Sequence, residues 1–172
     1  MKSTLLLAAL AVIAVPALAG KPHEHGVARL DVAVEPALVT LLLEVPLDSL
    51  LGFEHEPKTD AERQQAAAAL ARLRDAGALF HIDPAAGCVA GKVELVSAAL
   101  GLGGAAAGAG GHEDLDAKIE FGCKDGNRAG FVEVGLFDAF ARLQRVDVQA
   151  VTRRGQLKAT LRRPVTRLPL AR

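Results

Sequence analysis

The feature that most constrains this fold is the alternation of apolar and polar residues in short runs separated by turn residues. Residues 26–35 (GVARLDVAVE) alternate in this way, with Val32 and Val34 on the apolar side and Leu30 out of step with Val27. After Pro36, residues 37–45 (ALVTLLLEV) are more continuously apolar. Because successive side chains of a strand point to opposite faces, the two runs predict an antiparallel hairpin whose second strand is more buried.

Similar runs continue along the chain. They predict strands at residues 78–82, 88–98, 116–123 and 131–134, and on both sides of Arg154-Gly155, with a proline-interrupted edge segment after them. Between the first hairpin and these strands, residues 46–59 contain two prolines and a glycine, which favours a loop with one helical turn.

Two segments have helical character. Thr59 and Glu62 have the spacing of a capping box ahead of an alanine-rich run that stops at Gly77, a residue suited to a helix C-cap. Its buried stripe is expected to be Ala66, Leu70 and Leu73. A short amphipathic helix is expected over residues 136–143. The chain therefore predicts an α+β fold, mainly an antiparallel β-sheet packed with one long helix and a short second helix.

The first residues have the layout of an export signal. Lys2 precedes an apolar run from Leu5 to Val15, and Ala17-Leu18-Ala19 has small residues at the positions that a signal peptidase requires. This pattern predicts a signal peptide over residues 1–19, cleaved after Ala19, and the run is short for a membrane-spanning helix. An uncleaved membrane anchor is the alternative. Residues 20–172 are expected to form a single domain, with a flexible Gly/Ala loop at 100–111.

The composition excludes some classes of partner. Twenty basic residues balance 20 acidic residues, so the near-neutral chain gives no reason to expect nucleic acid or an anionic membrane as a partner. The absence of Trp and Tyr argues against a binding site built on aromatic stacking. No second run of spanning length follows the leader, so no membrane insertion is expected after cleavage.

The chain contains two cysteines, Cys88 and Cys123. In an exported protein an even number of cysteines favours a disulfide. A redox or nucleophilic role is the alternative, but the cysteines form no C-x-x-C motif and neither has a histidine close in sequence.

Histidines next to acidic residues are the most informative polar pattern. They occur as His23-Glu24-His25, Glu54-His55-Glu56 and His112-Glu113-Asp114. In an extended segment His23 and His25 can face one ion while Glu24 faces the opposite side. Two imidazoles need a further ligand, for which His55 is the first candidate. The alternative is a solvated polar end without a function. The remaining histidine, His81, lies in an apolar run and is expected to be a packed or edge-strand residue.

Enzymatic motifs are absent from the sequence. There is no G-x-S-x-G and no H-E-x-x-H, and Ser49 and Ser97 occur in unremarkable contexts. The chain is therefore not expected to be an enzyme. A metal-dependent hydrolase using the histidines and Glu54 remains as an alternative.

Several segments together resemble one family. They are HEHGVARLDVAVE, LLGFEHEPKTDAER, the two cysteines, the histidine-acid segment leading into AKIEFGC, and the LF..F..L and GQ segments near the C-terminus. They resemble, in the same order, the ZrgA-like periplasmic zinc-regulated, zinc-binding proteins, long described as a domain of unknown function. The resemblance implies an exported protein that binds zinc and assists its uptake beside a zinc importer or its solute-binding protein.

The resemblance also implies a set of site residues. It carries His23, His25, His55 and His112 over as zinc ligands, and it matches Cys88 with Cys123 as the family's cysteine pair. Relatives of this type have a long histidine-rich insertion before the strand that ends at Cys123. Here LGLGGAAAGAGGHED takes that place, so we expect capacity for about one ion, with His112 acting as a flap that supplies a last ligand.

The sequence is compatible with three functions. The first is a periplasmic zinc-binding accessory protein. Its affinity for zinc is expected to decrease as the pH drops through the range in which histidines become protonated, near about 6.5. The second is an envelope structural or interaction module that has lost metal binding with its loop. The hydrolase is the third. Imidazole sites also accept copper and nickel, so the residues alone do not fix the metal.

Overall fold

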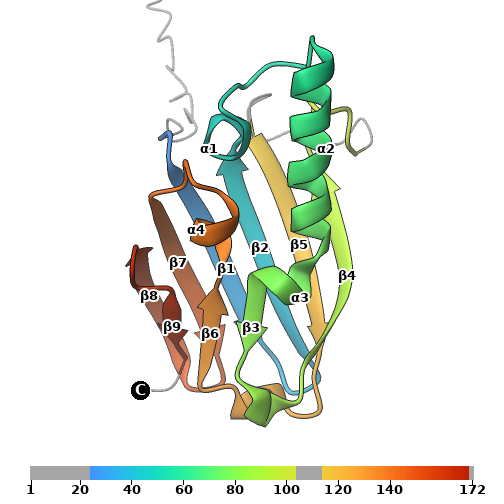
Figure 1. The fold of residues 1–172 in the computed structure, drawn as a ribbon. Helices are drawn as coiled ribbons and strands as arrows, with labels where there is room; N and C mark the ends of the chain where they lie inside the picture. Colours follow the sequence, from blue (N-terminus) through green and yellow to red (C-terminus); the bar gives the residue numbers. More distant parts are fainter. Residues whose placement is uncertain (1–23, 104–113, 171–172) are drawn as a thin grey trace, which may run out of the picture.

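The computed structural model describes residues 24–103 and 114–170 (Figure 1). The expected signal peptide, His23, His112 and most of the expected Gly/Ala loop lie outside these described residues.

The larger of two sheets has six strands. Their order across the sheet is β4 (Val89–Val96), β5 (Asp114–Gly122), β2 (Leu38–Pro46), β1 (Val27–Val34), β7 (Arg145–Thr152) and β8 (Gly155–Arg162). All neighbouring strands are antiparallel except β1 and β7, which are parallel. The mainly antiparallel β character expected from the sequence is therefore confirmed.

The first hairpin forms as expected, with one correction. β1 pairs antiparallel with β2, and Leu30 lies opposite Leu43. The buried face of β1 is formed by Ala28, Leu30, Val32 and Val34. Leu30 is in phase with the other buried residues, and it is Val27 that falls on the opposite face. The sequence-based expectation took Val27 as the first inward residue, because Ala28 is small and does not stand out as a core residue. Leu30 therefore seemed out of step.

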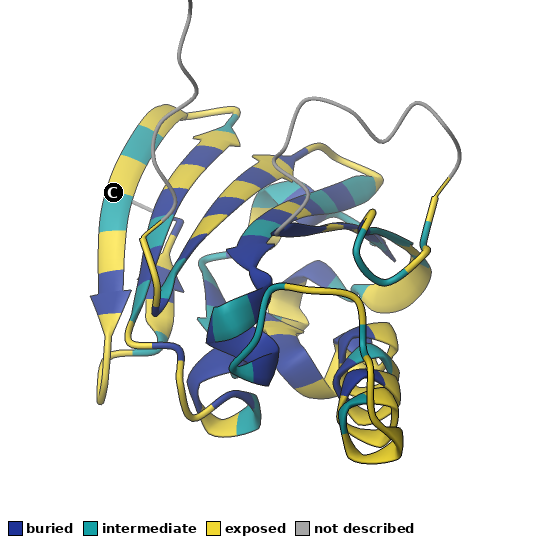
Figure 2. Ribbon diagram, turned by 90° about the horizontal axis from the view of Figure 1, so that it is seen from above, coloured by how far each residue is buried: buried dark blue, intermediate teal, exposed yellow. Residues whose placement is uncertain are grey.

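Helices and a second sheet cover one face of the large sheet, while the other face is open (Figures 1 and 2). The second sheet is small and has the order β3 (Phe80–Ile82), β6 (Phe131–Val134) and β9 (Arg167–Pro169). Short helices α1 (Leu47–Leu51), α3 (Ala76–Leu79) and α4 (Leu136–Ala139) connect these layers. Figure 2 shows the resulting alternation of buried and exposed residues along the strands of the large sheet.

Helix α2 (Asp60–Arg74) begins as the capping box predicts. The Glu62 amide donates to Thr59 Oγ1 at 3.2 Å, and the Thr59 amide donates to Glu62 Oε2 at 3.0 Å. The predicted end at Gly77 is wrong, because the C-cap is Asp75 and Gly77 lies inside α3.

Two further details differ from the expectation for this region. The buried stripe of α2 is Ala66, Ala69 and Leu73, while Leu70 is only partly buried. The strand expected from residue 78 begins at Phe80, because Ala76–Leu79 form the one-turn helix α3. Alanine and leucine favour this extra turn, and it places Leu79 in the core.

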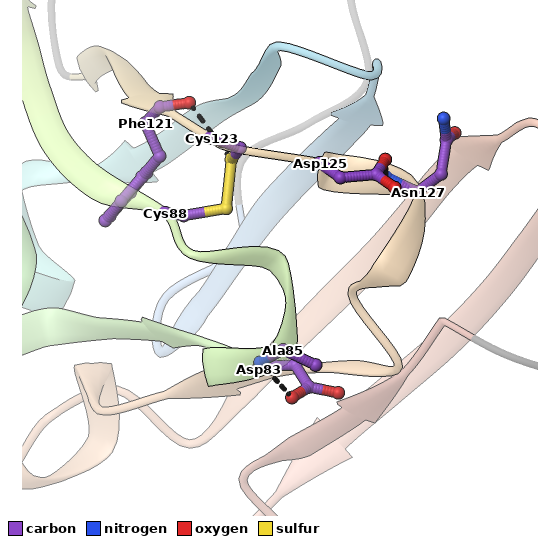
Figure 3. Close-up of a disulfide and its surroundings, with 7 residues drawn as sticks. All are labelled: Asp83, Ala85, Cys88, Phe121, Cys123, Asp125 and Asn127. Carbon is purple, nitrogen blue, oxygen red and sulfur yellow. Dashed lines mark hydrogen bonds between the residues drawn. A yellow bond between two sulfur atoms is a disulfide. The ribbon is translucent and has the colours of Figure 1, made fainter.

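A disulfide joins Cys88 to Cys123 at the end of the sheet where β4 begins and β5 ends (Figure 3). Two aspartates organise the adjacent loops. Asp83 Oδ1 accepts from the Ala85 amide at the start of the 3-10 turn Pro84–Ala86, and Asp125 Oδ1 accepts from the Asn127 amide in the 3-10 turn Gly126–Arg128. We call this region the disulfide end. The disulfide expected from the cysteine count is present.

None of the helices within residues 24–103 and 114–170 is long and apolar enough to span a membrane.

Candidate metal centre

The strand register brings three histidine- or acid-bearing segments to the opposite end of the large sheet. Pro46, the last residue of β2, pairs with Asp114, the first residue of β5. β1 runs antiparallel to β2, so its first residue, Val27, lies at this same end. His25 precedes β1 and Asp48 follows β2. Asp114 is buried at 4% exposure and directly follows the sequence His112-Glu113. We call this region the histidine end.

The backbone around His25 is fixed from both sides. The Gly26 amide donates to Ser49 Oγ at 2.8 Å, and Ser49 is fully buried in α1. The Gly26 carbonyl accepts from the Gln144 amide at 2.8 Å and from the Arg145 amide at 3.0 Å. Ser49, which looked unremarkable in the sequence, therefore holds the Gly26 backbone against α1.

Glu24 and His25 contact different groups. Arg145 donates to both carboxylate oxygens of Glu24, at 3.3 Å and 2.7 Å. This hydrogen bond is the main cause that raises the pKa of Arg145. The extended conformation considered for this segment is not found at His25, because His25 and Gly26 form a turn in which the Val27 amide donates to the Glu24 carbonyl oxygen at 3.1 Å. The side chains of Glu24 and His25 nevertheless have different partners, Arg145 for Glu24 and the two carboxylates for His25.

The His25 ring lies between two carboxylates from a different segment of the chain. Its Nε2 is 2.9 Å from Glu54 Oε1, and its Nδ1 is 3.7 Å from Asp48 Oδ2. The His25 side chain is 62% exposed, whereas those of Asp48 and Glu54 are about a quarter exposed. One imidazole and two carboxylates are ligands that zinc accepts. Each ring nitrogen of His25 faces a different carboxylate. A zinc ion could therefore be bound by His25 and one of these carboxylates only after the ring or that carboxylate moves.

Asp48 has a second cationic neighbour. Its Oδ1 is 3.6 Å from Nη2 of Arg142, while its Oδ2 faces His25. The Arg142 guanidinium packs against Gly52, where a Cβ would come within 2.7 Å of the guanidinium. Gly52 also ends α1 in the left-handed conformation, with φ of 80°.

His55 belongs to a separate cluster. Its Nδ1 is 2.9 Å from the Glu56 carbonyl oxygen, its ring stacks on Phe53, and its Nε2 is 4.0 Å from Glu62 Oε1. Glu62 meanwhile accepts from the Thr59 and Lys58 amides, which are the main causes that lower its pKa. Glu62 is thus shared between the helix cap and His55.

The structure describes only two of the four expected zinc ligands, His25 and His55. In residues 24–103 and 114–170, no group of three or more His, Cys, Asp or Glu side chains is arranged closely enough to hold a metal ion. His25 contacts Asp48 and Glu54, and His55 contacts Glu62. His23 and His112 lie outside the described residues, so the four-histidine set His23, His25, His55 and His112 stays a prediction.

A large cavity lies away from the histidine clusters. It has a volume of about 780 Å³, lies between α2, α3, β6 and α4, and is lined by His81, Glu133, Asp138 and Arg72 among others. His81 is exposed on β3, an edge strand of the small sheet, as its edge-strand alternative predicted. The clusters of His25 and His55 are therefore separate from this cavity.

Three residues of the histidine end were not expected from the sequence: Asp48, Ser49 and Arg142. Asp48 and Ser49 lie in α1, and Arg142 lies 117 positions after His25. The register of β1 with β2 and with β7, together with the hydrogen bonds of Gly26, brings them to His25.

The sequence profile of the ZrgA family of zinc uptake proteins matches residues 22–170, which is nearly the whole chain. The match includes the HEHG segment, the two cysteines and every strand and helix described above. No curated protein matches the chain well enough to count as a relative.

Proposed function

Because this chain belongs to the ZrgA family of zinc uptake proteins, we propose that it is a periplasmic accessory protein that binds zinc as cargo and assists its uptake or homeostasis. The observation that carries this proposal at the level of residues is the contact of His25 with Glu54 and Asp48. Imidazole and carboxylate groups are a donor set that zinc accepts.

The proposed site uses His25 as its fixed ligand. Glu54 or Asp48 would supply a carboxylate oxygen after a small side-chain movement, and His23, His55 and His112 are the further imidazoles that the family resemblance assigns. Ordering a chain segment to complete a site lowers the observed affinity. The hydrogen bond that the Gly26 amide donates to Ser49, and those that its carbonyl accepts from the Gln144 and Arg145 amides, reduce this cost for His25.

A carrier role fits the chemistry better than hydrolysis. A zinc hydrolase needs an open coordination position with a poised base beside it. Glu54, the base considered for such a role, instead faces Nε2 of His25 directly. We therefore propose that the protein has no catalytic function and that an importer or its solute-binding component receives the zinc.

Export is part of the same proposal. The disulfide between Cys88 and Cys123 is typical of proteins that fold in an oxidising compartment. Cleavage after Ala19 would leave the HEHG segment close to the amino terminus of the mature protein.

Zinc titration of metal-free protein against a competing chromogenic chelator tests the proposal. We expect His25→Ala to weaken zinc binding by about tenfold or more, which is the size reported for the loss of a group that orients or forms a metal site. His81→Ala is the matched control, because His81 is also exposed but lies on β3. Equal affinities of wild type and His25→Ala would contradict the proposed site.

His112 needs its own variant. If it completes the site, His112→Ala lowers zinc affinity in the same titration, and unchanged affinity removes it from the ligand set. Absence of zinc binding by the wild type would instead favour the interaction module that has lost its metal.

A further inference from the structure

A built-in cation occupies one side of the proposed site. Arg142 lies at the histidine end with its Nη2 3.6 Å from Asp48 Oδ1, on the far side of Asp48 from His25. The two oxygens of Asp48 are thus divided between an imidazole and a guanidinium. An ion that takes Asp48 as a ligand must draw one of these oxygens away from its present neighbour or share it.

The position of Arg142 is set by the fold. The Gly26 carbonyl accepts hydrogen bonds from the amides of Gln144 and Arg145. These bonds fix the backbone two and three residues after Arg142 next to Gly26. The Arg142 carbonyl oxygen also lies 3.3 Å from the place where a Cβ of Gly26 would be. The backbone that carries Arg142 is therefore held near Gly26, and rotation of its long side chain is the simplest way for the guanidinium to leave Asp48.

Gly52 gives the guanidinium its place. A Cβ there would approach Nη2, Nε and Cζ of Arg142 to between 2.7 Å and 2.9 Å, so only glycine leaves room for the observed contact. The left-handed conformation at the end of α1 already favours glycine. The conformation of the helix end alone would explain a glycine at position 52. The close approach of the Arg142 guanidinium is a second feature that depends on this glycine.

We propose that Arg142 is a competing cation that lowers the affinity of the site for zinc and is displaced from Asp48 when the metal binds. This inference rests on the proposed function. The physical reason is that a guanidinium stabilises the carboxylate in the metal-free state and repels a divalent ion bound next to it. A carrier that passes its cargo to a transport system gains from such a limit, because the ion remains releasable.

The exposure of the groups sets the size of the effect. Arg142 is 54% exposed and Asp48 24% exposed, so water screens the pair and the energy of the contact is modest. A positive charge about 6 Å from a divalent ion in such surroundings changes the binding constant by about three- to tenfold.

The test is a zinc titration of four full-length mature proteins: wild type, Arg142→Gln, Arg29→Gln and His25→Ala. Arg29→Gln is the matched control, because Arg29 also forms a partly exposed ion pair, with Glu44, and the variant has the same net charge as Arg142→Gln. We expect Arg142→Gln to bind zinc about three- to tenfold more tightly than Arg29→Gln, and the difference to shrink at high salt.

The outcomes separate the two proposals. If His25→Ala weakens binding but Arg142→Gln equals Arg29→Gln, Arg142 does not compete and only this inference fails. Weaker binding by Arg142→Gln would also overturn it, because Arg142 would then support the site. If His25→Ala binds as well as wild type, the proposed site fails and this inference fails with it. If the wild type does not bind zinc, the proposed function itself fails.

A second measurement follows Arg142 directly. The Nε–H signal of its side chain in nitrogen-15 NMR spectra should shift upon zinc addition in the wild type. Arg142→Lys should keep intermediate affinity, since lysine retains the charge without the planar guanidinium. An Nε–H signal that zinc leaves unchanged would show that the contact with Asp48 persists, which contradicts displacement.

Discussion

The two ends of the six-stranded sheet are stabilised in different ways. At the disulfide end, a covalent bond joins β4 to β5, and the Asp83 and Asp125 carboxylates bind backbone amides. At the histidine end, the backbone is also fixed, but the side chains of His25, Asp48 and Arg142 meet through partly exposed contacts, of which that between Asp48 and Arg142 is an ion pair. Interactions of the first kind stabilise the fold, whereas those of the second kind cost little to exchange for a ligand.

The histidine end can therefore bind and release a ligand without a loss of stability for the whole domain. The core residues of β1, β2 and β5 are buried along the whole length between the two ends. Changes at the disulfide end should therefore reduce stability with little effect on zinc binding, and changes at the histidine end should do the reverse.

Removing the disulfide should have the largest effect. In the chain-entropy model, a bridge between residues 35 positions apart contributes about 3 to 4 kcal/mol to the free energy of unfolding. We expect Cys88→Ser/Cys123→Ser to lose about this amount in urea denaturation, while the zinc affinity of the folded protein stays the same. A loss of zinc affinity in the folded double variant would show that the two ends are coupled.

The next largest effect is expected at Gly126. Its amide donates to the Pro36 carbonyl at 2.7 Å, and a Cβ here would overlap the Glu35 carbonyl oxygen. Gly126→Ala should therefore reduce the free energy of unfolding by about 1–3 kcal/mol, since the backbone must move to accommodate the methyl group. Gly122→Ala is the control, because nothing lies within 4 Å of a Cβ at that position. Equal destabilisation by both variants would contradict the close packing described for Gly126.

A pH titration should separate the two ends within one protein. Hydrogen bonds from the Ala85 and Gly130 amides lower the pKa of Asp83 below 3.8. A lowered folded pKa stabilises the protein above the unfolded value, and this contribution is lost as the pH falls through the folded value. Zinc binding requires neutral imidazoles and should already weaken between about pH 7 and pH 5.5.

The measurement is zinc affinity and thermal unfolding over the same pH series. We expect zinc affinity to fall while the unfolding temperature is kept until the pH drops below about 4. Asp83→Asn should reduce stability at neutral pH, and its difference from wild type should vanish at the lowest pH. Loss of fold and of zinc binding at the same pH would remove the distinction between the ends.

The smallest effect on stability is expected for His25→Ala. The contacts of His25 with Glu54 and Asp48 involve a side chain that is 62% exposed, so the free energy of unfolding should change by less than about 1 kcal/mol. Urea denaturation of this variant and of His81→Ala should give similar midpoints. A much larger loss for His25→Ala would mean that this histidine serves the fold.

The strands were predictable because their alternation is local. The pairing of β1 with β2, the alternation of Ala117, Ile119 and Phe121 in β5, and the capping box of α2 all depend on residues close in sequence. The end of α2 was misplaced because Gly77 suggested a C-cap, whereas packing of Leu79 into the core favoured another helical turn.

The candidate site was only partly predictable for the opposite reason. The sequence pointed to His25 and His55 through their acidic neighbours, yet His25 contacts Asp48 as well as Glu54, and His55 contacts Glu62. Asp48 and Ser49 join the histidine end through the antiparallel pairing of β1 with β2, and Arg142 joins it through the parallel pairing of β1 with β7 and the hydrogen bonds of Gly26. A single sequence contains no local signal for such pairings.

The most direct test of the account is to locate the metal. A crystal structure of the zinc-loaded protein, with anomalous diffraction measured at the zinc edge, would place the ion relative to each histidine. The account predicts an anomalous peak about 2.0–2.2 Å from a ring nitrogen of His25 and from an oxygen of Glu54 or Asp48, with Arg142 turned away from Asp48. A peak at His81 would contradict it. So would a peak elsewhere in a structure in which His25 still contacts Glu54 and Asp48 and binds no zinc.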